Sequence, residues 1–207
     1  MIRLYILLVI VGLCTQSYSQ DSIRVQFIYG SRPLKKYKAE EKKWFGGILG
    51  GHVGIEGDSG KFYSFEIHGK NKIFNGKANN SIYKIETAQE FWSIMKTKED
   101  SLKITTVVVP ITAEQKQKFD SITSAYYRQV PYSYSIFGMR CGASTYDILA
   151  QMGFFPRYSR FKTCMKIFYP GRLRKRLLIR AKENNWTIIR KQGTPKRKWE
   201  RDVKFKV

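Results

Sequence analysis

The chain has 207 residues, a formal net charge of +22 and a sequence pI near 10.0. An apolar fraction of 43% with 14% aromatic residues is normal for a globular protein and excludes disorder over most of the chain. The length suits one domain with a hydrophobic core and is short for two. The charge favours polyanionic partners such as lipid phosphates or acidic glycans, whereas no nucleic-acid-binding motif appears, so a nucleic acid is not the expected partner.

Residues 1–19 have the layout of a secretory signal peptide. Arg3 precedes an apolar run over 4–13, and a small-x-small cleavage site ends at Ser19. The apolar run is shorter than the about 20 residues that a membrane span needs. We therefore expect an exported protein, periplasmic or associated with the cell envelope, whose mature chain is a single domain over 20–207.

The mature sequence predicts strands mixed with helices. In chain order these are strands at 24–29, 50–57, 61–68 and 81–85, a helix capped by Thr87, a strand over 101–111, a helix capped by Thr112, a helix from Cys141 to Gly153, a helix around Cys164, a basic helix over 170–183 and a strand at 185–190. Antiparallel strands with helices gathered to one side indicate an α+β fold.

Both histidines lie on the strands at 50–57 and 61–68. Asp58-Ser59-Gly60 is a favoured three-residue hairpin loop, with the glycine in the left-handed conformation. The resulting register pairs His52 with Glu66 and gives each face of the hairpin its own set of residues. The apolar face holds Val53, Ile55, Tyr63, Phe65 and Ile67, and the polar face holds His52, Gly54, Ser64, Glu66 and His68. The histidines either face solvent without a role or share a site.

The mature chain has two cysteines with different surroundings. Cys141 stands at the expected start of a helix, where unpaired backbone N–H groups and the helix dipole stabilise a thiolate. The N–H groups of Cys141 and Gly142 can also hold the oxyanion of a tetrahedral intermediate, and a histidine nearby can act as the base. Cys164 has apolar neighbours and is expected to be a small buried side chain. A redox pair is disfavoured because there is no Cys-x-x-Cys.

Two segments carry a resemblance to a known group of enzymes. The strand "GGHVGIE", a second strand ending in a polar residue and the later helix "RCGASTYDIL" resemble the circularly permuted papain-like cysteine hydrolases. This group includes permuted NlpC-type peptidases and lecithin–retinol acyltransferase-like enzymes. The whole chain also resembles small exported bacterial proteins of unassigned function.

The resemblance covers about 24–155 and implies a permuted papain-like fold, with an antiparallel sheet packed against the helix that begins at the cysteine. It implies Cys141 as nucleophile, His52 as base and His68 as the residue that orients the base. Glu66 is the alternative orienting residue, because it lies opposite His52 and would stabilise an imidazolium. Arg140 and "CGAS" stand where acyltransferase-type members carry Asn and "CEHF", which argues against that branch.

These observations predict an exported thiol hydrolase, an amidase or peptidase before an esterase or acyltransferase, that acts on a bacterial envelope component. The alternative is a non-catalytic basic protein that keeps the fold and binds anionic lipid or glycan. No cofactor and no metal is expected, because two histidines without an Asp/Glu ligand cluster make a poor zinc set.

The C-terminal extension from about residue 170 is strongly basic. Residues 172–207 hold 14 Lys or Arg against three acidic residues. The side chains expected to contact an anionic envelope polymer or membrane surface are Arg172, Arg174, Lys175 and Arg176.

Overall fold

The computed structural model describes residues 21–41, 50–57, 60–70, 72–74, 80–96 and 98–201. The predicted signal peptide, the turn residues Asp58 and Ser59, and the last six residues lie outside these ranges. Among the described helices, none combines the length and the apolar character needed to cross a bilayer.

Six of the described strands form one antiparallel sheet in the order β5-β4-β3-β1-β6-β7. They are β1 (Ser22–Tyr29), β3 (Gly51–Glu56), β4 (Phe62–Ile67), β5 (Ser81–Glu86), β6 (Ile104–Pro110) and β7 (Ile188–Lys191). The β-branched stretch of β6 pairs with the apolar β1 at the centre of the sheet, where such residues pack well.

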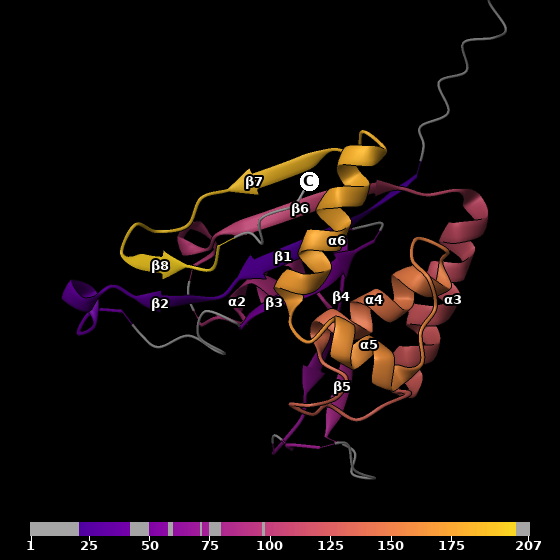
Figure 1. Ribbon diagram of the computed structural model, residues 1–207, viewed down its shortest axis with the longest axis horizontal. Coiled ribbons are helices and arrows are strands. Elements are labelled where there is room, and N and C mark those ends of the chain that lie inside the picture. The colour runs from indigo at the N-terminus through magenta and orange to yellow at the C-terminus, as the bar shows by residue number, and fades with distance from the viewer. Residues whose placement is uncertain are drawn as a thin grey trace, which may run out of the picture.

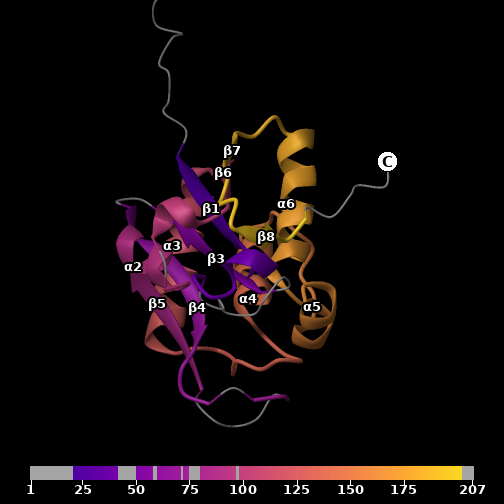
Figure 2. The same cartoon turned by 90° about the vertical axis from the view of Figure 1, so that its left-hand side faces the viewer.

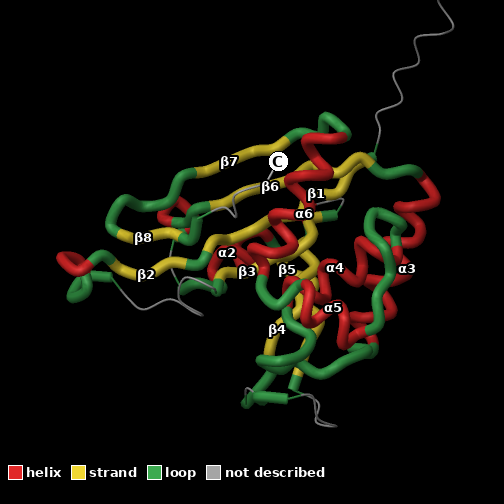
Figure 3. Tube along the Cα trace, viewed as in Figure 1, coloured by secondary structure: helices red, strands yellow, loops and turns green. Residues whose placement is uncertain are grey.

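A second, smaller sheet joins the two ends of the described chain. It pairs β2 (Ser31–Pro33) with β8 (Arg197–Trp199), and a 3-10 turn, η1 (Lys35–Tyr37), follows β2. Figure 3 shows this pair at one end of the molecule, away from α3 and α5. The three residues of β8 lie in a charged stretch without a strand pattern, which explains why the sequence does not predict them.

The described α-helices are α2 (Ala88–Ser93), α3 (Ala113–Arg128), α4 (Cys141–Gln151), α5 (Arg160–Lys166) and α6 (Pro170–Glu183), and a 3-10 turn, η4 (Glu99–Ser101), precedes β6. Thr87 and Thr112 begin α2 and α3 with capping boxes, as the sequence predicts. In Figures 1 and 2, α4, α5 and α6 lie on one side of the sheet and α2 on the other. The predicted α+β class is confirmed.

The hydrophobic core is divided between the two faces of the sheet. The larger cluster lies between the sheet and α3–α6 and includes Val53, Ile55, Phe65 and most of α4. The smaller one lies on the α2 side and includes Phe62, Phe91 and Trp92. Nine of the eleven residues from Cys141 to Gln151 are buried, which fits a helix enclosed by other elements.

The basic segment from about residue 170 is part of this core. Helix α6 buries Leu173, Leu177 and Leu178, and β7 forms an edge of the main sheet. Arg174 lies on the same buried stripe, only 1% exposed, with its Nη2 3.2 Å from Glu200 Oε2. The prediction that Arg174 contacts an anionic surface is therefore wrong, because its helical spacing directs it inward. Arg172 is exposed, and Lys175 and Arg176 are half-buried.

Candidate active site

The hairpin that carries His52 has the predicted register. Ile55 pairs with Tyr63 and Gly54 with Ser64, and the N–H of Gly57 donates to the carbonyl of Lys61. Gly60 has a φ of +68°, the left-handed conformation that this turn requires. Val53 and Ile55 therefore enter the larger core, while the His52 ring lies on the α2 side, 5.5 Å from the ring of Phe91 between centroids.

Strands β3 and β4 separate at the end that carries His52. Their pairing runs from Glu56 and Phe62 to Gly54 and Ser64, although β3 continues along β1 and β4 continues along β5. The backbone N–H of Val53 lies close enough to the Cys141 sulfur to lower the pKa of the thiol. This N–H belongs to the peptide that directly follows His52. The start of α4 thus reaches the sheet beside the residue that carries the imidazole.

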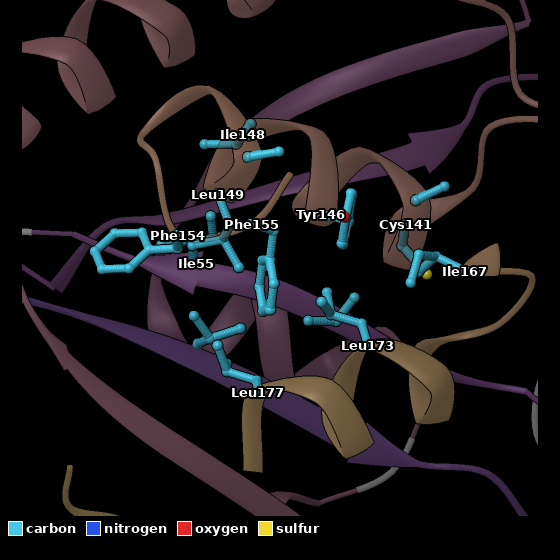
Figure 4. Packing of buried hydrophobic residues seen from close by; sticks show 14 of the residues in the cluster. Ile55, Cys141, Tyr146, Ile148, Leu149, Phe154, Phe155, Ile167, Leu173 and Leu177 are labelled. Atoms are coloured by element: carbon cyan, nitrogen blue, oxygen red, sulfur yellow. The ribbon is translucent and has the colours of Figure 1, made fainter. Parts of the chain in front are cut away.

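The thiol of Cys141 is held in a protonated state. It is 4% exposed and lies near Ile167 in the apolar cluster of Figure 4. Burial raises its pKa to about 11, although Arg140 and the N–H groups of Val53 and Gly142 lower it. The expected lowering of the pKa by the helix N-terminus is thus outweighed by burial.

Gly142 allows the start of α4 to pack closely against another helix. A Cβ on Gly142 would lie 3.2 Å from the backbone N and Cα of Pro170, the first residue of α6. A side chain at this position would push the two helices apart. The Cys141 sulfur is therefore placed by backbone packing as well as by its own contacts.

The imidazole of His52 is buried and neutral. Burial lowers its pKa to about 4, with Glu86 raising it and Lys84 lowering it. Its Nε2 has no hydrogen-bond partner within the described residues and lies 3.9 Å from Oε1 of Glu66. A neutral ring has the protonation state that a general base needs.

Glu66 belongs to a polar network on two neighbouring strands, β4 and β5. Its Oε2 lies 2.6 Å from Nζ of Lys84, which is also 3.5 Å from Oε1 of Glu86. Ser64 Oγ donates to Glu86 Oε2 at 2.6 Å. Lys84 and Glu86 are not among the residues predicted for the site, although their alternation with the buried Tyr83 in "SIYKIE" could have placed both on one face of β5.

His68 lies apart from this network. It follows the last residue of β4, is exposed, and its backbone N–H donates to the carbonyl of Asn80 at 2.8 Å. Of the two candidate orienting residues, the structure places Glu66 beside the imidazole.

A small cavity of about 120 Å³ opens beside the imidazole. Its walls include His52, Phe65, Glu66, Ile94 and Tyr134. Tyr134 comes from the loop before α4, and its pKa is raised by burial and then by Cys141. Tyr134 is not among the residues predicted for the site from the sequence. The volume holds a few waters or one small chemical group.

A larger recess of about 450 Å³ adjoins this cavity and shares Glu66 and Ile94 with it. Lys84, Glu86 and Tyr127 are among its other wall residues. A substrate that extends beyond the small cavity could lie in this recess.

Comparison with protein-family models and with curated proteins finds no match. Among solved structures, the chain is similar to the crystal structure of the type VI secretion system effector TseH. The similarity has 12% sequence identity and a TM-score of 0.40, over 72% of this chain and 88% of that chain. A similarity of this size carries no argument about function.

The site contains the groups that thiol chemistry uses. Where β3 and β4 separate, the Cys141 sulfur lies near the backbone of Val53 in the larger core, and the His52 imidazole lies beside Glu66 on the α2 side. Within the described ranges, no group of three or more His, Cys, Asp or Glu is arranged to hold a metal ion.

Proposed function

We propose that this chain is an exported thiol hydrolase that cleaves an amide bond in a component of the bacterial envelope, as an amidase or peptidase. One observation carries the proposal. The Cys141 sulfur lies near the peptide N–H that follows His52, whose imidazole is neutral. A cysteine at a helix start beside such a base is the arrangement that nucleophilic catalysis by a thiol requires.

Acylation begins from a neutral pair, because the pKa of Cys141 is raised and that of His52 is lowered. The sulfur attacks the carbonyl carbon while the thiol proton moves to the imidazole. The carbonyl π electrons move to the oxygen, which the N–H groups of Cys141 and Gly142 hold. The carbon–nitrogen bond then breaks, His52 returns its proton to the leaving amine, and a thioester remains.

Hydrolysis of the thioester uses the same base. His52 takes a proton from water as the water oxygen attacks the thioester carbon, and the carbon–sulfur bond breaks. The sulfur recovers a proton from the imidazolium, and a carboxylic acid is released.

Glu66 is the orienting residue in this scheme. With Nε2 directed toward its carboxylate, 3.9 Å away, Nδ1 is the ring nitrogen that takes the thiol proton. The carboxylate also stabilises the imidazolium that forms during acylation. Lys84 holds the carboxylate in place from its other oxygen.

The test is amine release from purified cell-wall sacculi by the parent chain, Cys141→Ser and His52→Ala. Amide cleavage frees amino groups, whereas ester cleavage frees acid and alcohol. We expect release by the parent and a loss of about 100-fold or more in each variant, the usual contribution of an acid–base group. Release by Cys141→Ser at the rate of the parent would overturn the proposal.

The second candidate is a non-catalytic envelope-binding protein that keeps the fold. Burial and protonation of the Cys141 thiol in the resting structure favour it. On this alternative, sacculi release no amine, and the parent and Cys141→Ser sediment with them to the same extent.

A further inference from the structure

A basic cleft of about 560 Å³ lies against the small sheet. Its walls are formed by four cationic side chains, Arg32, Lys35, Lys38 and Lys198, together with Pro33, Leu34 and one carboxylate, Glu41. The cations come from β2, the turn η1 that follows it, and β8, so segments from both ends of the described chain build the site. Figure 1 shows β2 and β8 at the end of the molecule away from α4.

The positive charge of the cleft is not neutralised within the described chain. The neighbouring carboxylates bind other cations: Glu40 Oε2 lies 3.0 Å from Lys196 Nζ, and Glu41 Oε2 lies 2.8 Å from Arg197 Nη1. Among the residues that the structure describes, none forms an ion pair with any of the four cations that line the cleft. Their mutual repulsion favours an anion between them.

The pairing of β2 with β8 brings two of these cations next to each other. Arg32 lies directly opposite Lys198 in the β2–β8 pair, and like charges in opposite positions destabilise a sheet. The pair is held beneath them by Arg197, whose Nε donates to Ser31 Oγ at 2.8 Å. Both Arg197 and Ser31 are buried. The fold therefore holds Arg32 and Lys198 close together although they repel each other. A bound anion would offset this repulsion.

We propose that this cleft binds a segment of a phosphate-bearing linear polymer. A concave site of this volume fits a few units of a chain, whereas a flat bilayer surface would not fill it. Lysine ammonium groups bind phosphate as compact charges, and the Arg32 fork can bind two phosphate oxygens. The site retains the polymer and does not depend on Cys141.

Binding of end-labelled short-chain inorganic polyphosphate, measured by fluorescence anisotropy at physiological ionic strength, tests the proposal. The variant Lys35→Glu/Lys38→Glu/Lys198→Glu changes three exposed side chains of the cleft. We expect its affinity to fall roughly 100-fold and its salt dependence to weaken. The matched control Lys98→Glu/Lys118→Glu/Lys182→Glu makes the same charge change at exposed positions outside the cleft and should bind within about threefold of the parent.

Several outcomes would overturn the proposal. An equal loss in the control would mean that net charge alone binds the polymer, and no binding by the parent would exclude the site. Equal binding of dextran sulfate would exclude selectivity for phosphate, and vesicles of anionic phospholipid that bind with the same sensitivity to the cleft variant would make a membrane the occupant. Cys141→Ser should bind like the parent, so failure of the hydrolase proposal and failure of this one are distinguishable.

Discussion

Nε2 of His52 and Oε1 of Glu66 lie 3.9 Å apart in a buried part of the sheet, and Nζ of Lys84 lies 2.6 Å from the other oxygen of that carboxylate. Glu66 thus stands between a fixed cation and a ring that is neutral at rest. If His52 takes a proton, the same carboxylate is already in position to stabilise it.

Replacement of Glu66 should lower the rate of substrate turnover and raise the rate at which the Cys141 thiol is alkylated. Glu66→Gln is expected to lower amine release from sacculi about 10–100-fold, as removal of orienting groups usually does. It should also speed alkylation of Cys141 at pH 9, because Glu66 raises the pKa of that thiol. The exposed His68 provides the matched variant, His68→Gln, which should leave both rates unchanged. A loss of turnover in His68→Gln as large as in Glu66→Gln would assign the orienting role to His68.

Cys141 should alkylate slowly at neutral pH. With a pKa of about 11, its thiolate fraction at pH 7 is roughly 300-fold below that of an ordinary cysteine of pKa about 8.5. The rate with iodoacetamide, measured in a Cys164→Ala background, should rise about tenfold per pH unit above neutrality. Fast labelling that is independent of pH between 6 and 8 would instead indicate a thiolate–imidazolium pair.

His52 should make the fold sensitive to acid. Its pKa is about 4 in the folded chain against 6.5 ordinarily, so the unfolded chain binds this proton first as the pH falls. The free energy of unfolding should drop between pH 6.5 and 4 by roughly 3 kcal/mol from this residue alone. Urea titrations of the parent and His52→Gln measure this free energy at each pH. The difference in stability between the two chains should change by roughly 3 kcal/mol between pH 6.5 and 4. A constant difference would contradict the buried, neutral ring.

The Arg174–Glu200 pair should be needed for stability. Arg174→Met leaves the buried Glu200 carboxylate without this partner and is expected to cost about 3–5 kcal/mol. Arg174→Met/Glu200→Gln should recover part of the loss. Arg172→Met, on the exposed side of the same helix, should change the stability by about 0.5 kcal/mol or less in urea denaturation.

The sequence was sufficient for the parts of the site that depend on local patterns. Turn chemistry at Gly60 and the alternation of apolar residues predict which face of the hairpin carries His52 and Glu66. The start of a helix at Cys141 is also predicted, because a compact loop precedes an apolar stretch. Each of these features is decided by neighbours within a few residues.

Features decided by distant segments could not be predicted in this way. The raised pKa of Cys141 comes from burial among residues such as Ile167, which lie far along the chain. Arg174 has the sequence context of a surface residue, and only the position of Glu200 makes a buried arginine tolerable. His68 does not lie beside the His52 imidazole because β4 ends at Ile67. The end of a strand is hard to predict from sequence to within one residue.

The pairing of Ser31 with Trp199 has a consequence for the order of folding. The contact joins segments near opposite ends of the described chain, so the loop it closes is almost as long as the domain itself. At a synthesis rate of about 5–20 residues per second, the partner of β2 appears roughly 8–34 s after β2 itself. The small sheet, and with it the basic cleft, must therefore assemble last, after the main sheet has had time to form.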